Sequence, residues 1–245
     1  MKNKGLLFDK DGTLLEFHQM WLQVAHGAAQ ATLLAFKADN NNSFADDNAL
    51  LAAIGVVGER VDNHGLLASN PVEDTASAWY QLMQLSIDEG VFSRDVKNIF
   101  NQQVEDNPSL IQALPGVKDK LIELKESGFK LGIATADTKN ATLYSLVQSG
   151  LHDLFDFVGY SDGDIEPKPA PALLNAFCEH CDLAPQHVTM FGDTVSDMHF
   201  GRNAGAATVG VLTGTATAEE LHPYADHILN SVADFDTALT HCINK

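Results

Sequence analysis

Basic residues are scarce in this chain of 245 residues. It carries 33 Asp and Glu against 15 Lys and Arg, which gives a formal net charge of -18. No run of Lys or Arg offsets this balance locally. A protein this acidic repels nucleic acid and anionic membrane surfaces, because they carry charge of the same sign. We therefore expect neither as a partner, and an anionic substrate would need a local cation such as a metal ion.

Cysteines and long apolar runs are also few. The chain has 3 Cys, an odd number, and charged residues appear before any signal-like apolar region forms. No stretch approaches the roughly 18 apolar residues of a membrane span. These absences lead us to expect a reduced, soluble, cytoplasmic protein, either a monomer or a homodimer.

Strand and helix patterns alternate along the second half of the chain. Continuous apolar strands are expected at 5–8, 130–136, 155–161, 187–193 and 207–212, with a short one at DHILN. Helices are expected at 117–127, 138–149, 171–181, 196–204, about 217–222, and from about 232. This alternation predicts an α/β fold, with a doubly wound parallel sheet covered on both faces.

A different pattern occupies residues 16–108. Apolar residues recur there at helical spacing, around 21–35, 46–54, 74–88 and 94–104, and no strong strand is visible. We interpret this segment as an α-helical domain inserted into a core made of residues 1–15 and 109–245. The stretch 61–71 interrupts it with turn-forming residues and is expected to be a loop or a short hairpin.

Polar residues follow the expected strands where each strand ends. They are Asp9, Lys10 and Asp11, then Thr135 and Asp137, then Asp162 and Lys168, and finally Asp193 and Asp197. In an open parallel sheet, ligands bind beyond the carboxyl ends of the strands. We therefore expect these side chains to form one site, with Asp137 as the N-cap of the next helix.

This combination of side chains suits phosphoryl transfer. Carboxylates hold Mg²⁺, and the ion offsets the repulsion between an aspartate nucleophile and an anionic phosphate. A hydroxyl, an amine and backbone N–H groups can hold phosphoryl oxygens. The two-residue spacing of Asp9 and Asp11 lets one carboxylate attack phosphorus while the other transfers protons.

Four motifs in order resemble those of haloacid dehalogenase superfamily phosphatases, in particular the phosphoglycolate phosphatase-like group. They are Asp9-Lys10-Asp11-Gly12-Thr13, Thr135, Lys168 before Pro169, and Gly192-Asp193-Thr194-Val195-Ser196-Asp197. The resemblance implies a Rossmann-like core with a C1-type helical cap. It also implies a Mg²⁺-dependent phosphomonoester hydrolase that forms an aspartyl-phosphate with a small phosphorylated metabolite.

The resemblance also implies a role for each residue of the site. Asp9 is the expected nucleophile and Asp11 the acid/base. The phosphate-binding residues are expected to be Thr135, Lys168, Lys10 and Ala136. The metal is expected at Asp9, the backbone carbonyl of Asp11, and Asp193. Asp197 is either a further ligand, a residue behind the ligands, or an acidic residue at a helix start.

One residue departs from the group. Ala136 stands where Asn is frequent, which weakens the narrow assignment to phosphoglycolate. A phosphomutase similar to β-phosphoglucomutase remains an alternative, as does a binding protein without catalysis. Cys178 and Cys181 form a lone C-x-x-C pattern that is more typical of buried thiols on a helix than of a zinc or redox site.

The insert is expected to act as a lid. A covalent intermediate needs water excluded in the first step and admitted in the second. Chain connections near 14–18 and 108–116 can serve as hinges for residues 18–107. We expect the stretch 61–71 to face Asp9, with Ser69 and Asn70 contributing to substrate specificity.

Overall fold

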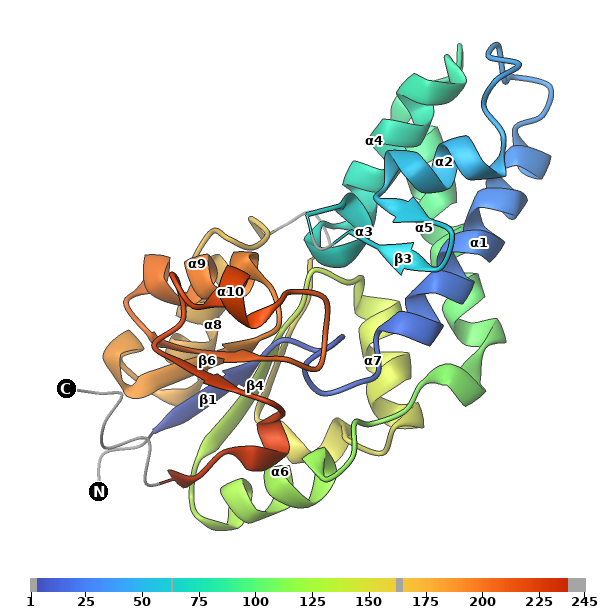
Figure 1. Ribbon diagram of the computed structural model, residues 1–245. Coiled ribbons are helices and arrows are strands. Elements are labelled where there is room, and N and C mark those ends of the chain that lie inside the picture. The colour runs from blue at the N-terminus through green and yellow to red at the C-terminus, as the bar shows by residue number, and fades with distance from the viewer. Residues whose placement is uncertain (1–3, 63, 162–164, 238–245) are drawn as a thin grey trace. The chain divides into compact units, whose positions relative to one another are not determined.

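The computed structural model describes residues 4–237 except 63 and 162–164 (Figure 1). The chain divides into two compact units, Met1–Phe17 with Ile111–Lys245, and His18–Leu110. We call the first the core unit and the second the cap unit. In the described part of the chain, no helix combines the length and apolar character that a membrane crossing requires.

The core unit is built on a six-stranded sheet in which all neighbouring strands are parallel. Its order is β5-β4-β1-β6-β7-β8. The strands are β1 (Gly5–Phe8), β4 (Lys130–Ala134), β5 (Phe157–Gly159), β6 (Val188–Gly192), β7 (Ala207–Val211) and β8 (His227–Leu229). The chain adds strands on one side of β1 and then on the other, so the strand order reverses beside β1. This confirms the doubly wound sheet, although β5 is shorter than the expected strand at 155–161.

Helices cover both faces of this sheet. They are α6 (Val117–Glu126), α7 (Lys139–Gln148), α8 (Ala172–Cys181), α9 (Val195–Ala204) and α10 (Ala218–Leu221), with 3-10 turns at His152–Leu154, Pro185–His187 and Val232–Asp234. α8 packs on β1, β4 and β5, and α9 packs on β6 and β7. The helix expected from about 232 is only a 3-10 turn in the described residues, and the part beyond Thr237 lies outside them.

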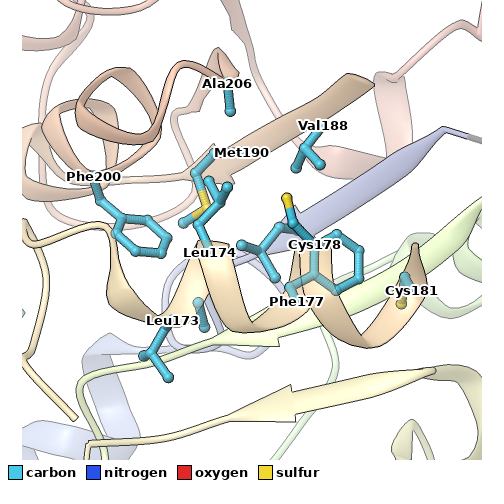
Figure 2. Packing of buried hydrophobic residues seen from close by; sticks show 11 residues of the cluster. Leu173, Leu174, Phe177, Cys178, Cys181, Val188, Met190, Phe200 and Ala206 are labelled. Atoms are coloured by element: carbon cyan, nitrogen blue, oxygen red, sulfur yellow. The ribbon is translucent and has the colours of Figure 1, made fainter. Parts of the chain in front are cut away.

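The core between the sheet and α8 is shown in Figure 2. Leu7 and Met190 project from the central strands into this cluster, where they meet Leu174 and Phe177 of α8. Because side chains alternate along a strand, Phe8 and its neighbour on β6 project from the opposite face of the sheet. There Phe8 stacks on Phe191 with ring centroids 4.9 Å apart, and Phe235 packs edge-on against Phe191 at 4.9 Å.

The two cysteines of the C-x-x-C pattern belong to the core on the α8 side. Both Cys178 and Cys181 are buried in the apolar cluster as free thiols. Burial raises the pKa of Cys178 to about 11, which keeps the thiol protonated. Within the described residues neither cysteine joins a group of three metal-ligating side chains. A packing role therefore accounts for the pattern.

The cap unit is mainly helical, as expected. Its elements are α1 (His18–Ala35), α2 (Asp47–Ala53), β2 (Val56–Val57), β3 (Arg60–Val61), α3 (Leu66–Ser69), α4 (Val72–Met83), α5 (Glu89–Asp106) and a 3-10 turn at Pro108–Leu110. The helix expected at 74–88 ends at Met83, because Gln84 takes a left-handed conformation with φ 52°. The stretch 61–71 begins at the last residue of the hairpin β2–β3, Val61, and is otherwise irregular in its described residues except for the single helical turn α3.

Candidate active site

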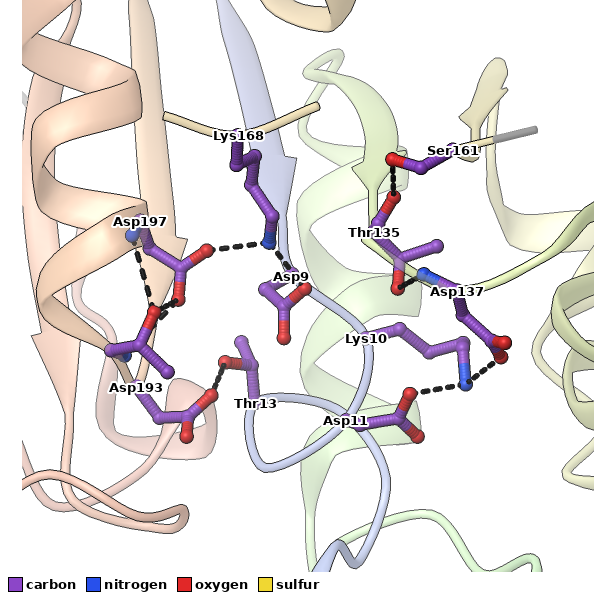
Figure 3. Close-up of polar contacts among 11 residues, drawn as sticks. Asp9, Lys10, Asp11, Thr13, Thr135, Asp137, Ser161, Lys168, Asp193 and Asp197 are labelled. Carbon is purple, nitrogen blue, oxygen red and sulfur yellow. Dashed lines mark hydrogen bonds and ion pairs between the residues drawn. The ribbon is translucent and has the colours of Figure 1, made fainter. Parts of the chain in front are cut away.

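The carboxyl ends of the central strands bring the predicted polar residues together (Figure 3). Asp9 follows β1, Thr135 follows β4, Asp193 follows β6, and Lys168 lies on the connection from β5 to α8. All four side chains belong to buried residues. Asp162, on the same connection as Lys168, lies outside the described residues. The structure therefore brings these four residues to the edge at which parallel sheets bind ligands.

The ammonium group of Lys168 bridges two of the carboxylates. Its Nζ lies 2.7 Å from Oδ1 of Asp9 and 2.6 Å from Oδ1 of Asp197. Burial lowers the pKa of Lys168, but Asp197 and Asp9 outweigh burial and hold that pKa above its ordinary value. Lys168 is therefore charged and fixed beside Asp9.

Asp197 uses both of its oxygens within the protein. While Oδ1 accepts from Lys168, Oδ2 accepts from the hydroxyl of Thr194 at 2.6 Å and from its backbone N–H at 3.1 Å. The Thr194 hydroxyl in turn accepts from the backbone N–H of Asp197, which completes a capping box at the start of α9. Of the roles considered for Asp197, this arrangement favours a residue behind the ligands, which holds Lys168 at the start of α9.

Asp193 is enclosed by backbone on two sides. Its Oδ1 accepts from the Thr13 hydroxyl at 3.1 Å, and its Oδ2 accepts from the backbone N–H of Thr215 at 3.0 Å. A methyl group at Gly12 would lie 2.7 Å from Oδ2, and one at Gly214 would lie 1.8 Å from it. Only glycine allows the backbone to approach this carboxylate so closely at both positions.

The turn after β7 was not recognised from the sequence. Besides the Thr215 contact, the Thr213 hydroxyl donates to the backbone carbonyl of Gly12 at 2.6 Å. This turn therefore fixes both Asp193 and the loop that carries Asp9. Its sequence signal was the Thr-Gly-Thr run directly after a buried strand, at the same edge of the sheet as the other site residues.

The buried carboxylates exceed the buried positive charge beside them. Ligand atoms of Asp9, Asp193 and Asp197 lie within 4.8 Å of one another, and Lys168 is the ammonium paired with this group. Three carboxylates and one ammonium carry a formal charge of -2. Burial raises the pKa of Asp9 to about 7, although the nearby Lys168 opposes this shift. The pKa of Asp193 is also raised, mainly by burial and secondly by the negative charge of Asp9.

A divalent cation fits this imbalance. It would neutralise the excess of two negative charges, and hard cations such as Mg²⁺ prefer the carboxylate and carbonyl oxygens found here. The donor set of the site is therefore suited to the metal that the sequence predicted.

Asp11 belongs to a second ionic cluster. Its Oδ2 lies 2.5 Å from Nζ of Lys10, which lies 3.2 Å from Oδ2 of Asp137. Burial lowers the pKa of Lys10, but Asp11 and Asp137 outweigh it and raise that pKa above its ordinary value. Because the Lys10 ammonium is engaged in this cluster, a phosphate contact at Lys10 would use its backbone N–H.

The turn after β4 is fixed by hydrogen bonds. The Thr135 hydroxyl accepts from the backbone N–H of Asp137 at 3.2 Å, and the Thr135 carbonyl accepts from the Ser161 hydroxyl at 3.2 Å. Asp137 is not the N-cap of α7, contrary to expectation. Thr138 takes that position, with its hydroxyl accepting from the backbone N–H of Ala141.

The two residues proposed for specificity lie in the cap unit. Ser69 is the last residue of α3, and its side chain is not described. Asn70 is exposed, and its Nδ2 donates to Oδ2 of Asp74 at 2.7 Å. Their role therefore stays a prediction.

Comparison with known proteins identifies the family. A family model described as haloacid dehalogenase-like hydrolase matches residues 3–205, so the chain belongs to this family. The motifs predicted this membership, and it is confirmed. The chain is 29% identical over 220 residues to "Probable phosphatase IndB" of Dickeya dadantii (strain 3937), an alignment that covers 88% of this chain and 84% of the relative.

Two further proteins extend the similarity over almost the whole chain. Pyrophosphatase PpaX of Bacillus mycoides (strain KBAB4) is 26% identical over 238 residues, covering 96% of this chain and 95% of the relative. A crystal structure described as a predicted phosphoglycolate phosphatase from Haemophilus somnus 129PT has a TM-score of 0.69 and 23% identity, covering 96% of both chains. This structural similarity shows a shared fold.

Proposed function

We propose that this protein is a Mg²⁺-dependent phosphomonoester hydrolase that acts through an aspartyl-phosphate on a small phosphorylated metabolite. The observation that carries the proposal is the buried cluster at the strand-order reversal. There a charged Lys168 holds Asp9, and the excess of negative charge suits a divalent cation. The relatives named as a phosphatase and a pyrophosphatase support the same class of reaction.

In this mechanism Asp9 and Asp11 divide the chemistry. A carboxylate oxygen of Asp9 bonds to phosphorus while the bond from phosphorus to the leaving oxygen breaks, and Asp11 gives a proton to that oxygen. Asp11 then takes a proton from water as the water oxygen attacks phosphorus. The bond from phosphorus to the Asp9 oxygen breaks in this step, so that inorganic phosphate leaves and the Asp9 carboxylate is restored.

The neighbouring groups hold the phosphoryl oxygens. The Lys168 ammonium comes from the connection between β5 and α8, and the Thr135 hydroxyl from the end of β4. Backbone N–H groups of Lys10 and Ala136 complete the proposed donor set. Asp9, Asp193 and the backbone carbonyl of Asp11 would hold Mg²⁺. The ion would supply positive charge that reduces repulsion between Asp9 and the phosphate.

The cap unit is proposed to act as the lid. Hinges near 14–18 and 108–116 would let residues 18–107 close during formation of the aspartyl-phosphate and open for water. Ser69 and Asn70 would then contact the non-reacting part of the substrate. We place the protein in the cytoplasm, as a monomer or homodimer without nucleic-acid or membrane partners.

The direct test is phosphate release from a panel of phosphorylated metabolites and 4-nitrophenyl phosphate. We expect release that requires added Mg²⁺ and stops on chelation. A sugar bisphosphate is added in parallel reactions, because a phosphomutase would return the phosphoryl group to a sugar rather than to water. Transfer that depends on the bisphosphate, with little phosphate released, would favour the mutase, and no turnover of either kind would contradict both.

A further inference from the structure

The second ionic cluster is centred on a fully buried lysine and has two partly buried carboxylates. The side chain of Lys10 has 0% of its surface exposed, that of Asp137 has 7% and that of Asp11 has 11%. Figure 3 shows the Lys10 ammonium between the two carboxylates, with Asp11 directed toward Lys10 rather than toward Asp9. A buried ammonium is costly unless it is paired, so both carboxylates hold it in place.

Asp137 is the fixed end of this cluster. Its Oδ1 accepts from the backbone N–H of Thr138 at 2.7 Å, and its own N–H donates to the Thr135 hydroxyl at 3.2 Å. Its backbone carbonyl accepts from the N–H of Ser161 at 3.0 Å. These contacts tie Asp137 to the ends of β4 and β5, and its Oδ2 reaches Lys10 at 3.2 Å.

Lys10 therefore connects the fixed carboxylate of Asp137 to the carboxylate of Asp11, the proposed acid/base. Asp137 holds the ammonium from the β4 side, and the ammonium contacts Asp11 on the β1 side at 2.5 Å. If the charge of Asp137 were removed, Lys10 would lose its anchor on the rigid turn. The ammonium and the Asp11 carboxyl group could then shift together.

Resting on the proposed function, in which Asp11 protonates the leaving group, we propose that Asp137 is a positioning residue for the Asp11 carboxyl group. It acts through Lys10 and touches neither the substrate nor the reacting atoms. A displacement of about 1 Å in a reacting group can cost about 10²-fold in rate. The effect should appear only where the reaction needs the proton from Asp11.

The test compares two esters that differ mainly in the basicity of the leaving group. Phenolate is strongly basic and needs a proton as it departs from phenyl phosphate, whereas 4-nitrophenolate leaves readily without one. The variant Asp137→Asn keeps an oxygen acceptor for Thr138 and removes the charge that holds Lys10. We expect kcat/KM for phenyl phosphate to fall about 10- to 100-fold more than kcat/KM for 4-nitrophenyl phosphate.

A matched control lies at the opposite end of β4. Asp156 also pairs with a lysine and accepts from a backbone N–H, with Oδ1 2.8 Å from Nζ of Lys130 and Oδ2 3.0 Å from the N of Leu131. Asp156→Asn makes the same chemical change away from the site. Its ratio of kcat/KM between the two esters should match that of the wild type.

The outcomes separate the two levels of the proposal. If folded Asp137→Asn has the wild-type ratio of kcat/KM between the two esters, whether or not both values fall, the positioning role is overturned and the proposed function still stands. Wild-type protein inactive on both esters with Mg²⁺ would overturn the proposed function and this inference with it. If the Asp137→Asn variant does not fold, Asp137→Ser provides a second uncharged variant, whose folding is checked by circular dichroism.

Discussion

Gly214 offers a test of how closely the backbone must approach Asp193. A methyl group at this position would lie 1.8 Å from Oδ2 of Asp193, 2.2 Å from its Cγ and 2.6 Å from its Cβ. The backbone of Gly214 is not in the left-handed region, so alanine can adopt it without strain. The effect of Gly214→Ala should therefore arise from the steric clash with Asp193.

The size of the effect follows from these distances. The methyl group and Oδ2 must separate by about 1.6 Å to reach the 3.4 Å of an ordinary contact. A shift of that size would disrupt the hydrogen bonds that Asp193 accepts from Thr215 at 3.0 Å and from Thr13 at 3.1 Å. Since misplacement by 1 Å can cost about 10²-fold, we expect kcat/KM to fall by about that factor. We also expect weaker binding of Mg²⁺, so that a higher Mg²⁺ concentration is needed for half-maximal activity.

The assay is a Mg²⁺ titration of 4-nitrophenyl phosphate hydrolysis, with the thermal midpoint measured in parallel to show that the variant is folded. Gly90→Ala in α5 is the control, because the added methyl group would overlap much less with its nearest atom, Oδ1 of Asp88 at 3.2 Å. The control should show wild-type kinetics. Folded Gly214→Ala with wild-type kcat/KM and Mg²⁺ half-saturation would refute the reasoning.

Three further outcomes are expected. Asp9→Asn should abolish turnover, a larger loss than the ~10²–10⁴-fold contributed by an acid/base; substantial remaining hydrolysis would rule out the covalent mechanism. Burial raises the pKa of Asp9 to about 7, so the metal-free folded protein holds protons that the unfolded chain releases, and its stability should fall as pH rises through that value. Mg²⁺ should therefore raise the thermal midpoint more at about pH 8 than at about pH 5.5, and equal shifts would contradict this. Substituting Ser69 and Asn70 by alanine should alter discrimination among natural phosphates more than turnover of 4-nitrophenyl phosphate, and parallel changes in both would count against the specificity role.

The sequence predicted the strand ends of the site because two local signals coincide there. Apolar runs marked the buried strands, and polar residues followed each run, as Asp9 follows β1 and Asp193 follows β6. Which residues become their hydrogen-bond partners is set over long range, and the local pattern does not indicate the pairing. Thr215 meets Asp193 only because β6 and β7 are neighbours in the sheet. Their adjacency is a property of the fold and not of the local pattern.

The end of α4 shows the same limit in the cap unit. Helical spacing continues to residue 88, yet the helix stops at Met83. Side chains from a distant loop take the carbonyls there, since Asn42 donates to the Leu82 carbonyl and Asn41 to the Gln84 carbonyl, each at 2.8 Å. Tertiary hydrogen bonds therefore set this helix end against the periodicity of the sequence.

Ala136 stands where related phosphatases often have Asn, and the structure shows what the neighbouring Asp137 does at this point of the site. By sequence, the exchange of a frequent Asn for Ala136 removes a polar group near the phosphate. In the structure, the next residue directs a carboxylate to Lys10, inside a cluster that also holds Asp11. That cluster has a formal charge of -1, whereas the cluster around Lys168 has a formal charge of -2 and suits a divalent cation. Each lysine thus pairs with two carboxylates, one of which is a proposed catalytic group, and only the cluster around Lys168 has an excess of two negative charges that suits a divalent cation.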